Sequence, residues 1–123
     1  MDETRASRRV SPLIIRAKFQ LGEKLLEGYV TNLSETGAFL ATEERTEVGE
    51  SFGLILDMPW TLGEVTAEAE VVWRTDQPGR GAERLPMGMG LMFLDVSDEG
   101  KEKLRTYIQK FCQLATQIGQ QAV

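Results

Sequence analysis

The sequence predicts a mostly β domain, a small antiparallel barrel or sandwich of six strands, followed by one helix. Apolar and polar residues alternate with a period of two along several short segments, as they do in half-buried strands. Turn residues separate these segments at short intervals, which is typical of an all-β domain. Residues 97–119 instead repeat their apolar residues at helical spacing. With 123 residues, 41% of them hydrophobic, the chain is long enough for one domain with its own core.

The first four strands are predicted between residues 13 and 56. A Gly22-Glu23-Lys24 turn joins the first two strands as a hairpin, Gly37 separates the second strand from the third, and a charged loop over 43–50 precedes the fourth. The residues that share one face are Leu13, Ile15, Ala17 and Phe19 in the first strand, Leu26, Gly28 and Val30 in the second, and Phe52, Leu54 and Leu56 in the fourth, while residues 38–41 begin the third.

The fifth strand, from Thr66 to Arg74, has the clearest alternation, and it predicts that Trp73 faces the core together with Val71. The segment 76–86 is rich in glycine, proline and charge, which predicts an exposed hairpin loop. Residues 87–93 form the last predicted strand, and their glycines indicate a bend or a close approach between backbones.

The helix is predicted to begin with Ser97 or Asp98 as its cap and to end at Gly119. Its apolar stripe must be covered, either by the β domain of the same chain or by a partner helix. Cys112 lies within this pattern and is predicted to be a buried structural thiol. It is the only cysteine, and the chain contains no histidine, which excludes Cys–His and Ser–His–Asp catalysis.

The net charge of −5 argues against a binder of long nucleic acids, but the charge is unevenly distributed. Residues 1–18 carry five cations against two acids, whereas residues 20–70 carry two cations against eleven acids. A basic N-terminal arm on an acidic body can attract a small anion while repelling a polyanion. The sequence shows no apolar stretch long enough to span a membrane and no signal-peptide pattern, so we expect a cytoplasmic protein.

Two polar clusters carry the candidate chemistry. Arg5 and Arg9, with Arg8 beside them, provide guanidinium groups that can grip a phosphate through paired hydrogen bonds and stack on a purine. Asn32 and Ser34 provide an amide and a hydroxyl, and Gly37 permits a positive φ in a turn without a side chain. Taken alone, the first cluster is more typical of a solvated charged tail, and the second of an ordinary turn between two strands. Together they predict a pocket for a small, planar, doubly negative ligand.

The two clusters, in this order and followed by Ala38 and Phe39, resemble the PilZ domain family, which is marked by Arg-x-x-x-Arg and Asp/Asn-x-Ser-x-x-Gly. The resemblance covers nearly the whole chain and extends to the segments Val71–Trp73 and Gly90–Phe93. It implies a six-stranded antiparallel β-barrel followed by a helix. The chain then divides into a basic arm over 1–12, a barrel over 13–96 and an amphipathic helix over 97–119.

The resemblance further implies binding of the bacterial second messenger cyclic di-GMP. In that case Arg5 and Arg9 hold the phosphates and contact guanine, Asn32 and Ser34 meet a guanine edge, and Gly37 shapes the turn, while Arg8 is an additional candidate. We expect the arm to become ordered when the ligand bridges it to the barrel, so that a downstream protein can sense the change. Motility, adhesion and exopolysaccharide control are the processes that the family suggests.

Three alternatives accompany this hypothesis. The domain could be an interaction module that keeps the fold but does not bind the nucleotide. It could form a homodimer through the C-terminal helix. It could be an enzyme, but Asp57, Asp95 and the pair Glu43-Glu44 lie in loops or at strand ends without convergence, so we predict no enzymatic activity. No metal site or other cofactor is predicted. Trp60, in a loop after Pro59, is a candidate for a partner contact.

Overall fold

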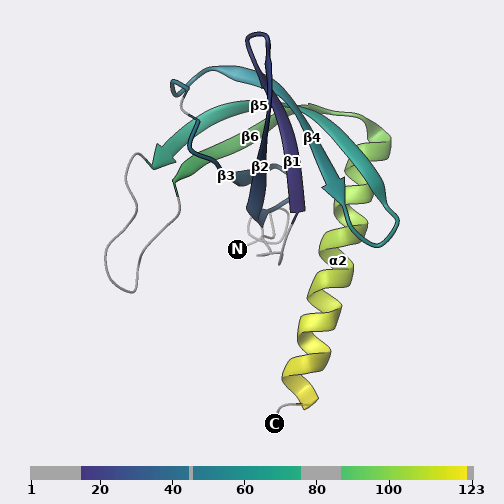
Figure 1. Cartoon of the computed structure of the whole chain (residues 1–123). Helices are drawn as coiled ribbons and strands as arrows, with labels where there is room; N and C mark the ends of the chain where they lie inside the picture. Colours follow the sequence, from purple (N-terminus) through teal and green to yellow (C-terminus); the bar gives the residue numbers. More distant parts are fainter. Residues whose placement is uncertain (1–14, 45, 76–86, 122–123) are drawn as a thin grey trace.

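The computed structural model describes residues 15–44, 46–75 and 87–121, the last seven of them by their backbone alone. Its six strands close into a barrel in the order β1-β2-β3-β6-β5-β4, in which β4 pairs back with β1 and every pairing is antiparallel (Figure 1). This confirms the predicted barrel. The strands are β1 (Ile15–Leu21), β2 (Lys24–Leu33), β3 (Gly37–Ala41), β4 (Ser51–Met58), β5 (Gly63–Thr75) and β6 (Gly88–Val96).

Strands β1 and β4 follow the alternation of the sequence without interruption. Every second side chain is buried except Leu21, which is half-buried at the end of β1, and the residues between them are exposed or half-buried. Phe19 of β1 and Phe52 of β4 meet inside the barrel with their ring centroids 5.5 Å apart. The predicted residues are buried, namely Ile15, Ala17 and Phe19 in β1 and Phe52, Leu54 and Leu56 in β4, and Met58 at the end of β4 is buried as well.

Strands β2 and β5 each contain one extra residue that interrupts the alternation. In β2 the register passes from Val30 to Asn32 while the partner strand β3 advances by a single residue. In β5 the register passes in the same way from Val71 to Trp73 against β6. Such β-bulges redirect the side chains that follow them.

The bulge in β5 overturns the prediction that Trp73 faces the core. Val71 is fully buried, as predicted, but the extra residue Val72 turns the next side chain outward, and Trp73 is 47% exposed. The alternation placed Trp73 on the wrong face because a strict period of two makes no allowance for an inserted residue. The predicted close approach at the glycines of β6 is confirmed, since a Cβ at Gly88 would lie 2.2 Å from the carbonyl oxygen of Leu40.

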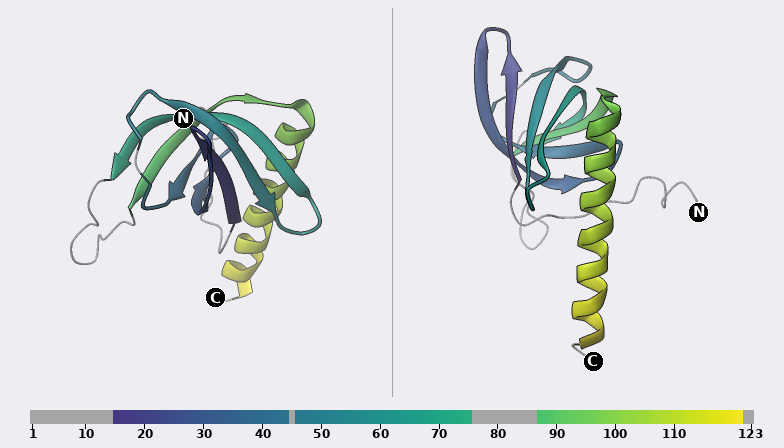
Figure 2. Two further views of the ribbon diagram at one scale, coloured as in Figure 1. Left: turned by 45° about the horizontal axis from the view of Figure 1, so that its top comes forward. Right: turned by 90° about the vertical axis from the view of Figure 1, so that its right-hand side faces the viewer.

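Helix α2 (Asp98–Gln121) begins as predicted and continues two residues past Gly119. The Ser97 Oγ accepts a hydrogen bond from the Gly100 amide at 3.0 Å, which caps the first turn. Both views in Figure 2 show the C-terminal part of α2 extending beyond the strands. The side chains that join the barrel core are Leu104, Tyr107 and Ile108, so the early turns of α2 pack on the barrel, which was one of the two predicted options.

The turn between β4 and β5 holds an aromatic side chain against α2. Trp60 and Thr61 both have φ near 60°, a left-handed conformation that bulky and β-branched residues rarely adopt. The Trp60 ring lies 4.9 Å from that of Tyr107, and burial raises the pKa of the Tyr107 hydroxyl. Trp60 is 42% exposed, which keeps it available for a partner contact. Cys112 is half-buried beside the core rather than fully buried.

Candidate functional site

The turn that joins β2 to β3 contains one of the two predicted clusters and is organised by Ser34. The Ser34 side chain is fully buried, and its Oγ accepts hydrogen bonds from the amides of Thr36 (3.2 Å) and Gly37 (3.1 Å). The Ser34 amide donates to the Gly37 carbonyl at 2.9 Å. Because a hydroxyl has two acceptor positions and one donor, these contacts occupy both acceptor positions of Ser34. Ser34 therefore fixes the shape of the turn.

Gly37 is required for a different reason from the one that the sequence suggested. Its φ is not positive. Among the glycines that the structure describes, those with a positive φ are Gly22, Gly49 and Gly63. Instead, a Cβ at Gly37 would lie 2.2 Å from the carbonyl oxygen of Leu91. The absence of a side chain lets β3 pair closely with β6 at the start of the strand.

Asn32 faces the outside of the barrel because of the bulge in β2. Val30 and Leu33 both face the core, so two consecutive residues between them, Thr31 and Asn32, face outward. Asn32 is half-buried and is paired in the register with Phe39 of β3. The amide group of Asn32 therefore lies on the outer surface at the base of a rigid turn, where it can present donors and an acceptor to a ligand.

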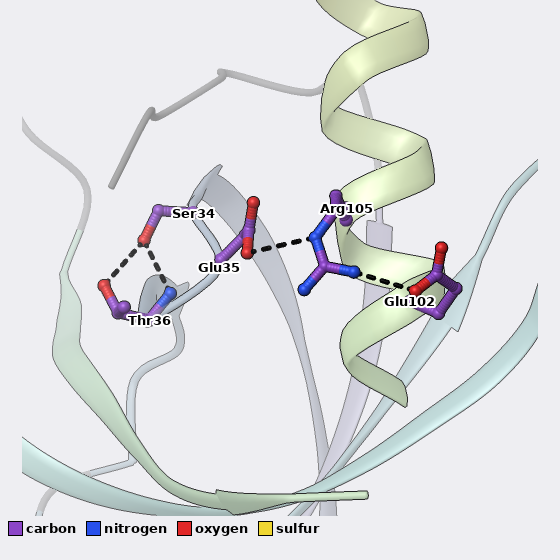
Figure 3. Close-up of polar contacts among 5 residues, drawn as sticks. All are labelled: Ser34, Glu35, Thr36, Glu102 and Arg105. Atoms are coloured by element: carbon purple, nitrogen blue, oxygen red, sulfur yellow. Dashed lines mark hydrogen bonds and ion pairs between the residues drawn. The ribbon is translucent and has the colours of Figure 1, made fainter. Parts of the chain in front are cut away.

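The same turn is connected to helix α2 by an ion pair. Figure 3 shows the Glu35 carboxylate pointing toward Arg105, while the hydroxyls of Ser34 and Thr36 approach each other. Arg105 Nε lies 3.7 Å from Glu35 Oε1, and Arg105 Nη1 donates to Glu102 Oε1 at 2.8 Å. Arg105 thereby offsets the charge of the only acidic side chain within the segment 32–37.

A hollow on the described surface lies elsewhere on the β2–β3 pair. It has a volume of about 630 Å³ and is lined by residues 26–29 of β2, by the end of β3 and the residues that follow it (41–44), and by Met87. Glu27, Glu43 and Glu44 contribute to this lining. Because these carboxylates repel an anion, the hollow does not suit the doubly negative ligand that the sequence predicts.

Other predicted site residues lie outside the described part of the chain. These are Arg5, Arg8 and Arg9 of the N-terminal arm, and the predicted loop over 76–86 is also outside it. In residues 15–44, 46–75 and 87–121, no helix has the length and apolar character needed to cross a membrane. Across the same ranges, no group of acidic or cysteine side chains is arranged to hold a metal ion.

Sequence reasoning missed one feature of the outer surface near Asn32. Phe39 and Trp73 stack with ring centroids 5.2 Å apart and an interplanar angle of 28°. The alternation assigned Trp73 to the core, and only the pairing register reveals the bulge that turns it outward. The spacing of Gly88 and Gly90 in β6 was the available signal, since small residues on one strand leave room for large rings from its neighbours.

Comparison with known proteins agrees with this fold. The family model of the PilZ domain matches residues 3–110. The crystal structure of YcgR from Escherichia coli in complex with c-di-GMP has a TM-score of 0.75 at 18% identity, over 95% of this chain and 50% of that chain. The PilZ domain of the same protein with c-di-GMP has a TM-score of 0.67 at 19% identity, over 89% of this chain and 95% of that domain.

A third solved structure is the Bacillus subtilis inhibitor of motility, MotI/DgrA, with a TM-score of 0.72 at 18% identity, over 87% of this chain and 50% of that chain. This chain therefore spans about half the length of MotI and of full YcgR. No curated protein sequence matches it.

A closed six-stranded antiparallel barrel with a capped C-terminal helix and a polar turn between β2 and β3 defines a domain of the PilZ type. Because the family model covers most of its length, the chain belongs to the PilZ domain family.

Proposed function

We propose that this protein is a cyclic di-GMP receptor that binds the nucleotide at the β2–β3 turn and passes the signal to another protein. The observation that carries the proposal is the turn itself. Ser34 and Gly37 hold it rigidly, and the bulge beside it turns Asn32 outward. Membership of the PilZ family and the c-di-GMP named for the similar YcgR structures support the same ligand.

We assign the predicted residues to distinct roles. Arg5 and Arg9 clamp the two phosphates and contact guanine, with Arg8 as an additional cation, because guanidinium groups bind phosphate through paired hydrogen bonds. Asn32 meets a guanine edge. Ser34, whose acceptor positions are occupied within the turn, acts by keeping the turn in shape rather than by direct contact.

The signal requires a second protein, because the proposed activity is binding and not catalysis. The ordering of the arm over 1–12 by the ligand is the proposed conformational change. Control of motility is the process that the similarity to the inhibitor of motility favours. A cytoplasmic location is part of the proposal, since cyclic di-GMP is an intracellular messenger. Leu114 on α2 is exposed, so a partner protein or a second copy of the chain is a candidate to bind at this part of the helix.

Calorimetric titration with cyclic di-GMP tests the proposal. We expect saturable binding that weakens with added salt, because the phosphate contacts are ionic. Arg5→Ala and Arg9→Ala should each lower the affinity at least tenfold, which corresponds to about 1.4 kcal/mol. Arg16→Ala is the matched control, since Arg16 is an exposed arginine on β1, and it should bind normally.

Unchanged affinity in both arm variants would reject the assigned roles of Arg5 and Arg9. Absence of any binding by the unmodified protein would favour the alternative, a PilZ-fold interaction module that does not bind the nucleotide. The titrated nucleotide should be recovered intact by chromatography after prolonged incubation. Turnover to a linear product would instead reveal a phosphodiesterase.

A further inference from the structure

The turn between β4 and β5 has a backbone conformation that its residues do not favour. The Leu62 amide donates to the Pro59 carbonyl at 3.2 Å, so Trp60 and Thr61 are the central residues of a β-turn. Both have a positive φ, a combination for which hairpin turns ordinarily use Asn-Gly. Backbone outliers of this kind are concentrated at functional sites, which makes the turn a candidate for a function of its own.

One face of helix α2 lies beside this turn (Figure 1). The residues of that face follow one another at helical spacing, and they are Lys103, Tyr107, Lys110 and Leu114. The Lys103 Nζ donates to the carbonyl of Glu64, just after the turn, at 3.1 Å, and the Trp60 ring lies 4.9 Å from the Tyr107 ring. Lys110 and Leu114 continue the same face toward the C-terminus.

The Trp60 side chain and this part of α2 border a cavity of about 260 Å³, which we call the Trp60 cavity. It is lined by Trp60, Lys110, Gln113 and Leu114. Its volume is below the roughly 300–1,000 Å³ of small-molecule sites, so it suits one side chain of another protein better than a free ligand. Trp60 is 42% exposed and rests on Tyr107, which is only 3% exposed. The indole is therefore a supported aromatic anchor, a residue type that dominates the binding energy of protein interfaces.

The charge of this face indicates the chemistry of its partner. The Lys103 Nζ lies 3.6 Å from Glu99 Oε2, whereas Lys110 forms no ion pair with any residue that the structure describes. Residues 103–121 contain three cations and no acid. A two-fold interface pairs a patch with itself, so a second copy of the chain would bring cations against cations. An acidic partner complements the patch instead.

We propose that the Trp60 cavity binds another protein through a segment in which an apolar side chain is flanked by Asp or Glu. The apolar side chain enters between Trp60 and Leu114, and a carboxylate pairs with Lys110. The inference rests on the proposed function only in its need for a second protein, and it adds the surface and the chemistry of that contact. The cavity contains none of the residues assigned to the nucleotide, so the two sites can be tested separately.

Two synthetic peptides serve as probes of the cavity. One has a central phenylalanine flanked by glutamates, and in the other lysines replace the glutamates. In NMR titrations followed at the indole N–H of Trp60, the acidic peptide should bind roughly fivefold more tightly than the basic one or better. Equal affinities, or no binding of either peptide at millimolar concentration, would overturn the proposal.

Reversing the charge of Lys110 tests the proposed ion pair. Lys110→Glu should make the protein prefer the basic peptide. Lys101→Glu is the matched control, because it changes the net charge equally at an exposed position nine residues away, on the opposite side of α2. This control should keep the preference for the acidic peptide. The same reversal in both variants would show a general charge effect and would overturn the role of the cavity.

Removing the indole tests the anchor and separates this inference from the proposed function. Asparagine is tolerated at positive φ, so Trp60→Asn removes the ring and suits the turn. It should weaken binding of the acidic peptide roughly fivefold or more, while calorimetry shows unchanged affinity for cyclic di-GMP. Unchanged peptide affinity would overturn the inference and leave the proposed function intact. Peptide binding as expected without any nucleotide binding by the unmodified protein would support the inference and overturn the proposed receptor.

Analytical ultracentrifugation of the unmodified protein tests the competing occupant, a second copy of the chain. The protein should sediment as a monomer. A dimer that dissociates in Leu114→Glu would show that a second copy covers the cavity, and it would overturn the proposal.

Discussion

The regular strands β1 and β4 and the bulged strands β2 and β5 build the same barrel from different patterns. In β1 and β4 every second residue faces the core, all of them buried except the half-buried Leu21, and the residues between them carry no candidate site. In β2 and β5 one extra residue turns Asn32 and Trp73 outward. The comparison teaches that the regular strands supply the packed core, whereas the irregularities turn further side chains to the surface, among them the candidate residue Asn32.

The turn between β2 and β3 belongs to the bulged region and depends on short-range contacts. Ser34 supplies acceptors for two backbone amides, and Gly37 allows β3 to approach β6. Residues of the same two types in β4, Ser51 and Gly53, are exposed. Substituting the same residue type in both regions therefore measures how strongly the stability of each region depends on its serine and its glycine.

The largest effect is expected for Gly37→Ala compared with Gly53→Ala. A methyl group at Gly37 would meet the Leu91 carbonyl at 2.2 Å, so the backbone must shift, and overpacking of this kind costs about 1–3 kcal/mol. A methyl group at Gly53 would meet nothing within 4 Å, and the stability should stay equal or rise by up to about 1 kcal/mol. Urea unfolding measures both. Similar destabilisation by the two substitutions would contradict the claim that the close backbone approach makes glycine necessary at position 37 but not at position 53.

A smaller effect is expected for Ser34→Ala compared with Ser51→Ala. Removing the Ser34 hydroxyl leaves the amides of Thr36 and Gly37 without their acceptor, which costs about 1–2 kcal/mol of unfolding free energy. The nucleotide affinity should fall as well, because the turn loses its fixed shape. Ser51 is exposed, so its substitution should change the stability by less than about 0.5 kcal/mol. A stable Ser34→Ala protein with normal affinity would show that the turn does not depend on this hydroxyl.

The smallest effect is expected for Arg105→Ala. Its guanidinium is 44% exposed and lies 3.7 Å from Glu35, and ion pairs at such exposed positions contribute about 0–1 kcal/mol. The loss should be measurable at low ionic strength and should disappear near 1 M salt, where exposed charges are screened. Lys101→Ala on the exposed side of α2 is the control. A large loss that persists in high salt would indicate that Arg105 has a packing role instead.

The sequence predicted most of the fold because most of the barrel is regular. Alternation together with the turn residues between the segments identified all six strands, and Ser97 or Asp98 identified the start of the helix. The sequence placed Asn32, Ser34 and Gly37 in one turn, whereas in the structure Asn32 belongs to β2, Ser34 to the turn and Gly37 to the start of β3. The outward orientation of Trp73 was not predicted, because a bulge is defined by the pairing with another strand and cannot be recognised in the local sequence pattern.

The reason why position 37 requires glycine could not be predicted either, because it depends on a contact between residues that are far apart in the sequence. The sequence indicated conformational freedom, but the structure shows a contact with Leu91, which is 54 residues away in the chain. Likewise, the burial of Ser34 follows from the turn and from β6, whose Phe93 amide donates to the Thr36 carbonyl at 2.8 Å. Residue types therefore revealed the site, while their separate roles emerged only from the three-dimensional contacts.

The most direct test of this account is a set of amide NMR spectra recorded during a titration with cyclic di-GMP. We expect the largest chemical-shift changes at Asn32 and at the turn that follows it, with the amides of β1 and β4 nearly unchanged. Changes centred on β1 and β4, or saturating nucleotide without any change in the bulged region, would contradict it.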